Sequence, residues 1–557
     1  MKKATIDYPW NEVVKTDSLY EMICMAADEN PDTPVFKFRK GKDNIIEISN
    51  SELKHNVDAM YLALDAIGAG NAHIAAIGPS SYKWLLSYIS TLCSESVFVP
   101  IDKDLPEADI INVINHSDSE FVFCATKKYE EMLKNNLDSL PNVKKIISFD
   151  KEEDEDNILS FDKLLENGKA ALNTTDKRPY FHTDIDSLKL LVYTSGTTGK
   201  AKGVMLSERN LTSCVCYGLM IADVSGSYLS VLPYHHTYEA VVGIWVAIHR
   251  RNTVCINENL KTVVPNLKLY EPDYLMLVPA FVESFYSKIW STIREQKKEK
   301  AFKLLIKLSN LMLKCGIDKR KELFGSVHKV FGGKLQKIVC GGAPIRKEIA
   351  DFFESIGIAL LNGYGISECS PLVSVNRDYF NDPATVGVKL PCIEVKLDDI
   401  NEDLNGEICV KGPTVMLGYY KNEEETKNSI IDGWFHTGDY GMINQYNQIL
   451  ITGRKKNLIV LNNGKNVYPE EIEDLIQSID EVAEVVVYSP KDENGSQKTL
   501  CAEVFLSEEI SKDVLTKKIR AVLSSLPAYK QVSEVTIREE EFEKTTSRKI
   551  KRAKYNG

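Results

Sequence analysis

A short segment rich in glycine, hydroxyl groups and lysine has the residue types that bind phosphate. It reads Tyr-Thr-Ser-Gly-Thr-Thr-Gly-Lys-Ala-Lys-Gly over residues 193–203 and begins where the apolar run Leu188–Tyr193 ends. Glycines let the backbone approach phosphate oxygens, hydroxyls donate hydrogen bonds and lysines offset negative charge. A flexible loop without function rarely combines so many of these types. The candidate phosphate ligands are Thr194, Ser195, Gly196, Thr197, Thr198, Gly199, Lys200 and Lys202.

This spacing differs from two common nucleotide-binding motifs. A Walker motif needs a second glycine five residues after the first, and Ala201 stands five residues after Gly196. No Gly-x-Gly-x-x-Gly opens a helix. The sequence therefore argues against a nucleotide switch and against hydride transfer.

Three further segments carry residues that suit a nucleotide. The first candidates are Gly342, Ala343 and Pro344, small residues that could admit the edge of a base. The second set adds an aromatic ring and a carboxylate, and comprises Asn362, Gly363, Tyr364, Gly365, Ser367 and Glu368. The third is Asp439, whose carboxylate could accept hydrogen bonds from ribose hydroxyls. Each segment is a weak signal alone, because turns and solvated acids are common.

Short apolar runs that alternate with helix-compatible stretches must position these residues. The predicted strands are Ile74–Gly78, Val97–Asp102, Phe121–Ala125, Lys145–Phe149, Leu188–Tyr193, Tyr274–Pro279 and Lys337–Cys340. Such alternation is typical of βα units and a mostly parallel sheet. The sequence thus predicts an α/β fold.

Beyond residue 454 the predicted strands and helices form a separate, compact set. The predicted strands beyond it are Leu458–Leu461, Val482–Tyr488, Cys501–Phe505 and Val535–Ile537, with helices near Glu470–Ile479 and Lys512–Ser525. About a hundred residues is a reasonable domain size. We therefore expect a domain over 1–453, a joint at 454–456 and a second domain over 457–557.

Composition excludes several classes of protein. The 557 residues are 43% hydrophobic and 26% charged, as in ordinary globular proteins, and the net charge of −11 disfavours nucleic acid as a partner. The N-terminus lacks the apolar core of a signal peptide, and no apolar run approaches the roughly 18 residues of a membrane span. The twelve cysteines are dispersed without a Cys-x-x-Cys pair, which favours free thiols in a reducing compartment. We expect a cytoplasmic protein.

The stretch Lys288–Lys321 combines a basic composition with helical periodicity. Leu304, Leu308, Leu311 and Cys315 recur at helical spacing among many lysines. A basic amphipathic helix can rest on an anionic membrane, although a stripe that faces a core is commoner. Peripheral membrane contact is therefore an alternative to a purely cytoplasmic location.

The order of the nucleotide motifs resembles the adenylate-forming (AMP-binding) superfamily, which contains acyl-CoA synthetases, firefly luciferase and peptide-synthetase adenylation domains. The match runs from about Tyr193 to Lys549. Within that superfamily the chain is most similar to bacterial long-chain fatty-acid–CoA ligases, through the segments 232–239 and 363–371 and the Lys/Leu-rich insert before Phe331. The resemblance implies a large N-terminal α/β domain of the acyl-CoA synthetase/luciferase type and a small mobile α+β C-terminal domain.

The resemblance also implies a role for each segment. Residues 194–202 would hold the β- and γ-phosphates of ATP, and Gly342 to Pro344 with Tyr364 would hold adenine. Asp439 and Arg454 would fix the ribose. Glu368 and Thr194 would bind Mg²⁺, a cation that favours oxygen ligands. Tyr234 and His236 would line the acyl pocket, although the adjacent His235 leaves the register open.

The segment 543–550 resembles the family's Pro-Lys-Thr-x-x-Gly-Lys-Ile, which would make Lys549 the catalytic lysine. Glu543 and Arg548 stand where the family has Pro and Gly, so Arg548 could contest the phosphate role. In this family the C-terminal domain rotates about a hinge, which here matches Lys456. The rotation would replace Lys549 by a thiol-delivery face that includes the loop at Gly464.

The reaction implied is ATP-dependent activation of a carboxylic acid, with a medium- to long-chain fatty acid preferred, to acyl-AMP, followed by transfer to coenzyme A. Two alternatives use the same residues: an acyl carrier protein as acceptor, and an aryl or other carboxylic acid as substrate. A catalytically silent nucleotide-binding module is a third alternative. The sequence does not define the oligomeric state.

Overall fold

The computed structural model describes residues 8–41, 44–175, 184–195, 201–402, 404–461, 465–490, 499–544, 550–552 and 555. The chain divides into two compact units. The first unit comprises Met1–Glu394, Val410–Phe435 and Tyr446–Gln448. The second comprises Val395–Cys409, His436–Gln445 and Ile449–Gly557.

A nine-stranded sheet in the first unit carries several of the predicted nucleotide residues. Its strands, in spatial order, are β16 (Val388–Lys389), β15 (Leu372–Val375), β14 (Ala359–Gly365), β13 (Lys337–Cys340), β12 (Tyr274–Leu277), β10 (Ser227–Ser230), β11 (Thr253–Ile256), β1 (Pro34–Lys40) and β2 (Asn44–Ser49). The strands from β14 to β1 run parallel, and antiparallel pairs close both ends. Parallel strands end at a common edge, which collects the loops that follow them.

An eight-stranded sheet in the same unit carries the predicted phosphate segment. Its order is β19 (Gly418–Tyr419), β9 (Ala201–Ser207), β8 (Leu188–Ser195), β4 (Val97–Ile101), β3 (His73–Ile77), β5 (Phe121–Cys124), β6 (Lys145–Ser148) and β7 (Ile158–Ser160). The run from β8 to β7 is parallel, whereas β8, β9 and β19 pair antiparallel.

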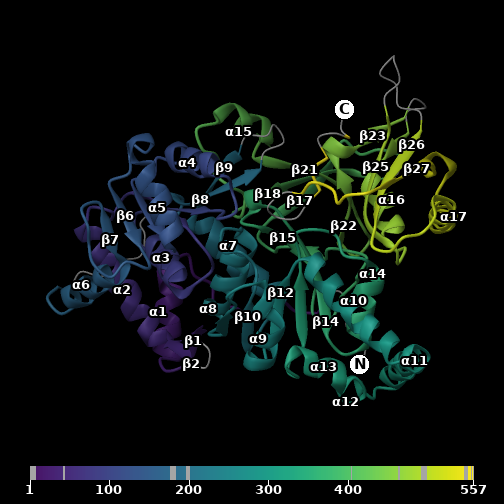
Figure 1. Cartoon of the computed structure of the whole chain (residues 1–557), viewed down its shortest axis with the longest axis horizontal. Helices are drawn as coiled ribbons and strands as arrows, with labels where there is room; N and C mark the ends of the chain where they lie inside the picture. Colours follow the sequence, from purple (N-terminus) through teal and green to yellow (C-terminus); the bar gives the residue numbers. More distant parts are fainter. Residues whose placement is uncertain are drawn as a thin grey trace. The chain divides into compact units, whose positions relative to one another are not determined.

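Helices surround both large sheets (Figure 1). The longer ones are α1 (Leu19–Glu29), α2 (Asn50–Ala66), α3 (Tyr82–Leu92), α4 (Glu107–His116), α5 (Lys127–Asn135), α6 (Phe161–Leu172), α7 (Glu208–Ile221), α9 (Val263–Tyr270), α10 (Pro279–Glu295), α11 (Glu299–Lys314) and α14 (Lys347–Ser355). Shorter segments are the π-helix η2 (Tyr238–Trp245), α8 (Val246–His249), α12 (Arg320–Leu323), α13 (Gly325–His328), the 3₁₀ turn η5 (Ser367–Cys369) and α15 (Glu423–Ser429). In the part of the chain that the structure describes, no helix has the length and apolarity needed to cross a membrane.

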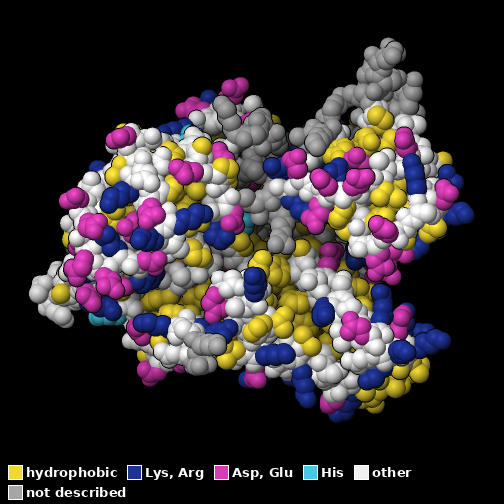
Figure 2. All heavy atoms as spheres, in the orientation of Figure 1, with side chains coloured by type: hydrophobic (Ala, Val, Ile, Leu, Met, Phe, Trp, Pro, Cys, Tyr) yellow, Lys and Arg dark blue, Asp and Glu magenta, His cyan; other side chains and the backbone are white. Residues whose placement is uncertain are grey.

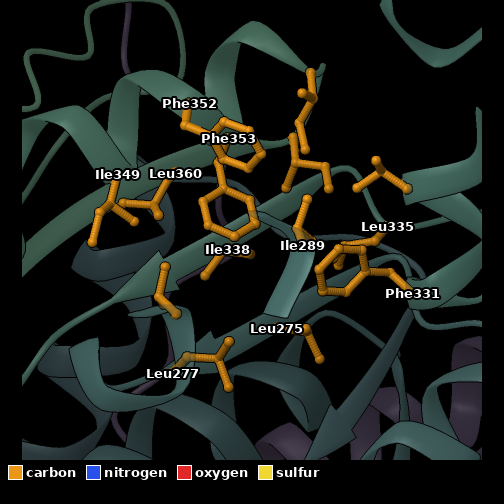
Figure 3. Close-up of a cluster of buried hydrophobic side chains, with 14 of the residues drawn as sticks. Leu275, Leu277, Ile289, Phe331, Leu335, Ile338, Ile349, Phe352, Phe353 and Leu360 are labelled. Carbon is orange, nitrogen blue, oxygen red and sulfur yellow. The ribbon is translucent and has the colours of Figure 1, made fainter. Parts of the chain in front are cut away.

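A buried hydrophobic cluster holds the central strands of the nine-stranded sheet in place. Figure 3 shows Ile338 of β13 and Leu360 of β14 meeting Phe352 and Phe353 of α14. Both strand residues are almost completely buried, as is Phe353. This packing fixes β13 and β14 side by side, so the segments that follow them start from fixed points.

The second unit has a core of its own. The second unit contains most residues of β17 (Glu394–Asp398), β18 (Gly406–Lys411) and β21 (Trp434–Ile443), and all of β22 (Ile449–Arg454). The short strands β23 (Ile459–Val460) and β24 (Asn466–Val467) follow. The three-stranded sheet β25 (Val482–Tyr488), β26 (Leu500–Leu506) and β27 (Val532–Arg538) packs with α16 (Pro469–Ile476) and α17 (Lys512–Val522) around buried Ile472, Val504 and Leu515.

The predicted fold class is confirmed: the protein is α/β, with a large first unit and a smaller second unit. The predicted strands of the first unit agree with β3, β4, β5, β6, β8, β12 and β13 to within about two residues. Most residues of several strands that precede residue 454 belong to the second unit. A hinge is a property of movement rather than of contact groups, so the joint at 454–456 stays a prediction.

Candidate active site

The β8–β9 hairpin presents the two ends of the predicted phosphate segment. Thr194 lies opposite Lys202 and Ser195 opposite Ala201 in the antiparallel register. Thr194 lies near the carboxyl end of β8 and Lys202 near the start of β9. Both residues are half-buried. The predicted ligands Gly196, Thr197, Thr198, Gly199 and Lys200 lie outside the described residues.

Tyr419 joins the end of this hairpin to Glu368. The strand β19 pairs with β9 so that Tyr419 lies opposite Val204. Its hydroxyl donates a 2.9 Å hydrogen bond to Oε1 of Glu368, and Nζ of Lys202 lies 5.2 Å from the centroid of its ring. Lys202 also forms an ion pair with Glu425 of α15. Two predicted site residues that are far apart in sequence are therefore held against one aromatic ring.

Electrostatics keep Tyr419 a hydrogen-bond donor. Burial raises the pKa of its phenol well above the ordinary value, and the carboxylate of Glu368 raises it further. The backbone adds a second link, because the amide of Met416 donates a 2.9 Å hydrogen bond to the carbonyl of Glu368. Glu368 is thus held by two contacts from the segment that ends in Tyr419, one at its carboxylate and one at its backbone carbonyl.

The predicted adenine segments meet at the carboxyl ends of β13 and β14. Cys340 lies opposite Asn362 in the parallel register, so the segment starting at Gly341 leaves the sheet beside the end of β14. A Cβ at Gly341 would lie 3.6 Å from the carbonyl oxygen of Gly363. The predicted residues Gly342, Ala343 and Pro344 are exposed there. Open α/β sheets bind ligands at this edge.

Several residues in and just after β14 have structural contacts. A Cβ at Gly365 would come 2.3 Å from the carbonyl oxygen of Pro371, which only glycine avoids. Asn362 is buried, and its side-chain amide donates a 3.2 Å hydrogen bond to the carbonyl of Pro383. Tyr364 is also buried, whereas Gly363 and Ser367 are half-buried.

In the second unit, the predicted ribose residues are brought together. Asp439 of β21 lies opposite Arg454 of β22, and Nε of Arg454 lies 2.6 Å from Oδ1 of Asp439. The carboxylate is buried while the guanidinium is 40% exposed, so the pair has one solvent-facing member. The carbonyl of Ile408 accepts a 2.7 Å hydrogen bond from Thr437, whose oxygen accepts one from the amide of Asp439.

Lys456 lies in a 3₁₀ turn (Lys455–Asn457) between two anchored neighbours. Nζ of Lys455 lies 2.7 Å from Oε2 of Glu407, and the side-chain amide of Asn457 donates a 2.6 Å hydrogen bond to Glu470. The side chain of Lys456 is itself exposed. Partial desolvation by nearby protein and the charge of Arg454 lower the pKa of Lys456.

The predicted catalytic residue Lys549 lies outside the described residues, as do Arg548 and Gly464. The residues on either side of 545–549 are described. Lys544 and Ile550 form an antiparallel bridge, and the amide of Lys551 donates a 2.8 Å hydrogen bond to the carbonyl of Glu543. Lys544 forms ion pairs with Glu484 and Glu541.

The predicted acyl-pocket residues lie beside a buried aromatic group in the first unit. Tyr234 is buried against Trp84, with ring centroids 5.3 Å apart. Nε2 of His235 lies 3.6 Å from Asp102, and burial lowers the pKa of this histidine, which keeps it neutral. His236 is half-buried with its ring centroid 4.1 Å from that of His235. The two rings are adjacent, so the structure does not favour His236 over His235 as the histidine that lines the acyl pocket.

Sequence reasoning missed Glu239, the buried carboxyl group next to this region. Tyr228 donates to both oxygens of Glu239 at 2.7 and 2.6 Å, and Ser230 donates to Oε1. Burial raises the pKa of Glu239 to about 7. Gly243 of η2 leaves the space, since a Cβ there would lie 3.1 Å from the hydroxyl of Tyr228. The apolar neighbours in sequence were a usable signal, because a lone acid there must be buried.

Glu239 predicts a pH dependence of stability. The unfolded carboxyl ionises near its ordinary value of 4.5 and the folded one near 7, so the contribution of Glu239 to stability is largest below pH 4.5 and falls as the pH rises to about 7. We expect Glu239→Gln to remove this fall, which is on the order of 3 kcal/mol. Urea unfolding across this range, followed by tryptophan fluorescence, would measure it, because all five tryptophans belong to the first unit.

The control for this measurement is Glu348→Gln, on an exposed position of α14. It should leave the pH profile of the parent protein unchanged. Glu208 is also a buried acid whose pKa is raised to about 7, so part of the fall should persist in Glu239→Gln. A fall between pH 4.5 and 7 that is as large in Glu239→Gln as in the parent protein would contradict the assignment.

Comparisons with known proteins agree with this architecture. The model of the family described as AMP-binding enzyme matches residues 25–420, and that of the AMP-binding enzyme C-terminal domain matches residues 471–549. ATP-bound MatB from Rhodopseudomonas palustris has a similar fold, with a TM-score of 0.74 at 22% identity over 95% of this chain and 96% of that one.

Two curated proteins are similar over most of the sequence. Fatty acyl-CoA synthetase B of Dictyostelium discoideum is 30% identical over 479 residues, which cover 78% of this chain and 69% of that protein. Long-chain-fatty-acid–CoA ligase FadD15 of Mycobacterium bovis is 26% identical over 539 residues, which cover 91% and 85%. Since the first family model alone spans more than half of the sequence, the chain belongs to the AMP-binding enzyme family.

Proposed function

We propose that this protein is an AMP-forming fatty-acid–CoA ligase. The reaction joins a medium- to long-chain fatty acid to ATP, releasing pyrophosphate and forming acyl-AMP, and then transfers the acyl group to the thiol of coenzyme A with release of AMP. Family membership supports the two-step chemistry, and the names of the Dictyostelium and Mycobacterium proteins support the fatty acid. The observation that carries the proposal is the joint attachment of Lys202 and Glu368 to Tyr419.

The central difficulty of the first half-reaction is the approach of two anions. A carboxylate and a phosphate repel by about 1 kcal/mol at 4 Å in water, and by several times more when desolvated. A cation must therefore lie between them. In this proposal Lys549 supplies that charge at the carboxylate and the α-phosphate, while Thr194 and Lys202 bind the outer phosphates.

The acidic member of the site fits a hard cation. Glu368 is half-buried and uses Oε1 for Tyr419, and its carboxylate type matches the oxygen ligands that Mg²⁺ prefers. Together with Thr194 it would hold Mg²⁺, which when bound neutralises charge on pyrophosphate.

A second group of possible metal ligands does not include Glu368. The donor atoms of Asp398, Cys409 and His436 lie within 4.8 Å of one another. That set includes a thiol and an imidazole, which suit softer metals than Mg²⁺.

The second half-reaction needs a different surface. An acyl adenylate is hydrolysed if water reaches it, so exclusion of water must precede entry of the thiol. The proposal includes a rotation about Lys456 that withdraws Lys549 and presents the face containing Lys465, Asn466 and Val467. It also includes peripheral membrane contact, because long-chain fatty acids partition into bilayers.

The test of the function is acid-dependent pyrophosphate release over a panel of carboxylic acids. We expect release with medium- and long-chain fatty acids to exceed release with aryl acids, and free coenzyme A to accept the acyl group better than a holo acyl carrier protein does. Preference for the carrier protein or for aryl acids would establish the corresponding alternative. Binding of ATP without acid-dependent release would overturn the proposal.

Lys549→Ala separates the two half-reactions. Loss of a preorganised cation should lower pyrophosphate release about 10²–10³-fold, while thioester formation from presynthesised acyl-AMP should survive. The matched control is Lys544→Ala, which removes a neighbouring lysine already paired with Glu484 and Glu541. Equal loss of both half-reactions in Lys549→Ala would remove Lys549 from its role.

Lys456→Pro tests the hinge. Proline fixes φ near −65° and so restricts rotation of the backbone at this position. We expect acyl-AMP formation to continue and thioester formation to fail, whereas Lys456→Ala should retain both because it removes only the side chain. Unchanged overall turnover in Lys456→Pro would show that the backbone turns elsewhere.

A further inference from the structure

The helix α11 (Glu299–Lys314) is attached to the first unit through one face only. Phe302, Leu305 and Ile306 pack against the cluster that holds β13 and β14. The ring of Phe302 lies 5.6 Å from that of Trp290, measured between centroids, and Ser309 is buried. This face accounts for the attachment of α11, and it leaves the opposite face free of the core.

That opposite face is apolar as well. Leu304, Leu308 and Leu311 are 67%, 49% and 60% exposed, and their spacing of four and three residues aligns them along one side of the helix. Ile317, just beyond the helix, is 49% exposed. Figure 2 shows hydrophobic side chains gathered at the lower right, over the position of α11 in Figure 1. Aligned exposed leucines are unusual on a surface with no partner.

Basic residues border this leucine face. Residues 297–321 include nine lysines and arginines but two acids, in a chain whose net charge is −11. The exposed Lys300, Lys307 and Lys314 recur every seven residues, about two helical turns, and therefore follow one flank of the leucines. Both acids are already paired: Glu299 lies 2.6 Å from Lys303 and Asp318 lies 2.8 Å from Arg320. The surface is thus apolar along its centre and positive at its margin.

We propose that the outer face of α11 is a docking surface for an anionic membrane. The leucines would enter the boundary between headgroups and acyl chains, and the lysines would contact lipid phosphates, as amphipathic helices at membrane interfaces do. The inference rests on the proposed function for its purpose, since a lipid surface would supply the fatty acid. The surface itself stands on the exposure and charge of α11.

A second copy of the chain fits this face less well. A symmetric dimer with the two copies of α11 antiparallel would bring the same patch of each copy together and place the lysine rows against each other. A membrane of anionic lipid instead offers opposite charge and an apolar interior on one surface. The chemistry of the patch therefore selects lipid as the occupant.

The experiment compares vesicle binding by full-length variants. The test variant carries Leu304→Ser, Leu308→Ser and Leu311→Ser. The matched control carries Leu260→Ser, Val264→Ser and Leu269→Ser, which remove three exposed apolar side chains of 56%, 43% and 45% exposure from the segment of α9. Binding is measured by co-sedimentation with phosphatidylcholine vesicles, with and without phosphatidylglycerol.

We expect the parent protein and the control to bind the phosphatidylglycerol vesicles and to detach as salt is raised. The α11 variant should bind at least about tenfold more weakly. Lys300→Gln with Lys307→Gln and Lys314→Gln should weaken binding to anionic vesicles only. Tryptophan-monitored unfolding and coenzyme A ligation of a water-soluble acid without vesicles should match the parent in every variant, which separates this inference from the proposed function.

Three outcomes would overturn the inference. The first is a parent protein that ignores anionic vesicles at low salt. The second is an α11 variant that binds them as the parent does. The third is a parent oligomer that the α11 variant converts to a monomer without a change in vesicle binding, which would assign this face to contact between copies.

Discussion

The hydrogen bond from Tyr419 to Glu368 is the contact on which the candidate site of the first unit depends. It joins residues 51 positions apart, and the same ring supports Lys202. In the proposed function the carboxylate of Glu368 and the ammonium group of Lys202 both act near phosphates, and opposite charges without other partners attract each other. The aromatic ring and the partner Glu425 keep the two charges on separate supports. The sheet pairing of β19 with β9 maintains this arrangement through the backbone.

Sequence periodicity predicted much of the fold, because buried parallel strands are continuous apolar runs. Phe121–Cys124 and Tyr274–Leu277 illustrate this, since every residue of each strand is buried and each strand pairs with two parallel neighbours. The grouping of strands between residues 395 and 453 was beyond such reasoning. These strands range from the alternating β17 to β18, which is buried at five consecutive residues, and periodicity does not show which of the two units a strand belongs to.

Some residues of the candidate site could be predicted from the sequence and others could not. Asp439 and Arg454 lie opposite each other in a hairpin, and the ends of β13 and β14 lie side by side. The sequence motifs could therefore predict that residues on neighbouring strands come together. Tyr419 was not predictable in this way, because its contact with Glu368 joins residues far apart in the sequence. The apolar neighbours of Glu239 indicated its burial, but not its hydrogen bonds with Tyr228 and Ser230. The residues 196–200 and Lys549 keep the roles implied by resemblance as proposals.

The ion pair between Lys202 and Glu425 gives the proposed site an internal competitor for its ligand. A triphosphate that recruits Lys202 must displace a carboxylate that is already present. If Lys202 binds the nucleotide as proposed, this ion pair would cancel part of the attraction between lysine and nucleotide, and it would moderate the affinity for pyrophosphate in the same way. A tethered counter-ion of this kind favours turnover over tight retention, because the same carboxylate that resists entry also assists departure.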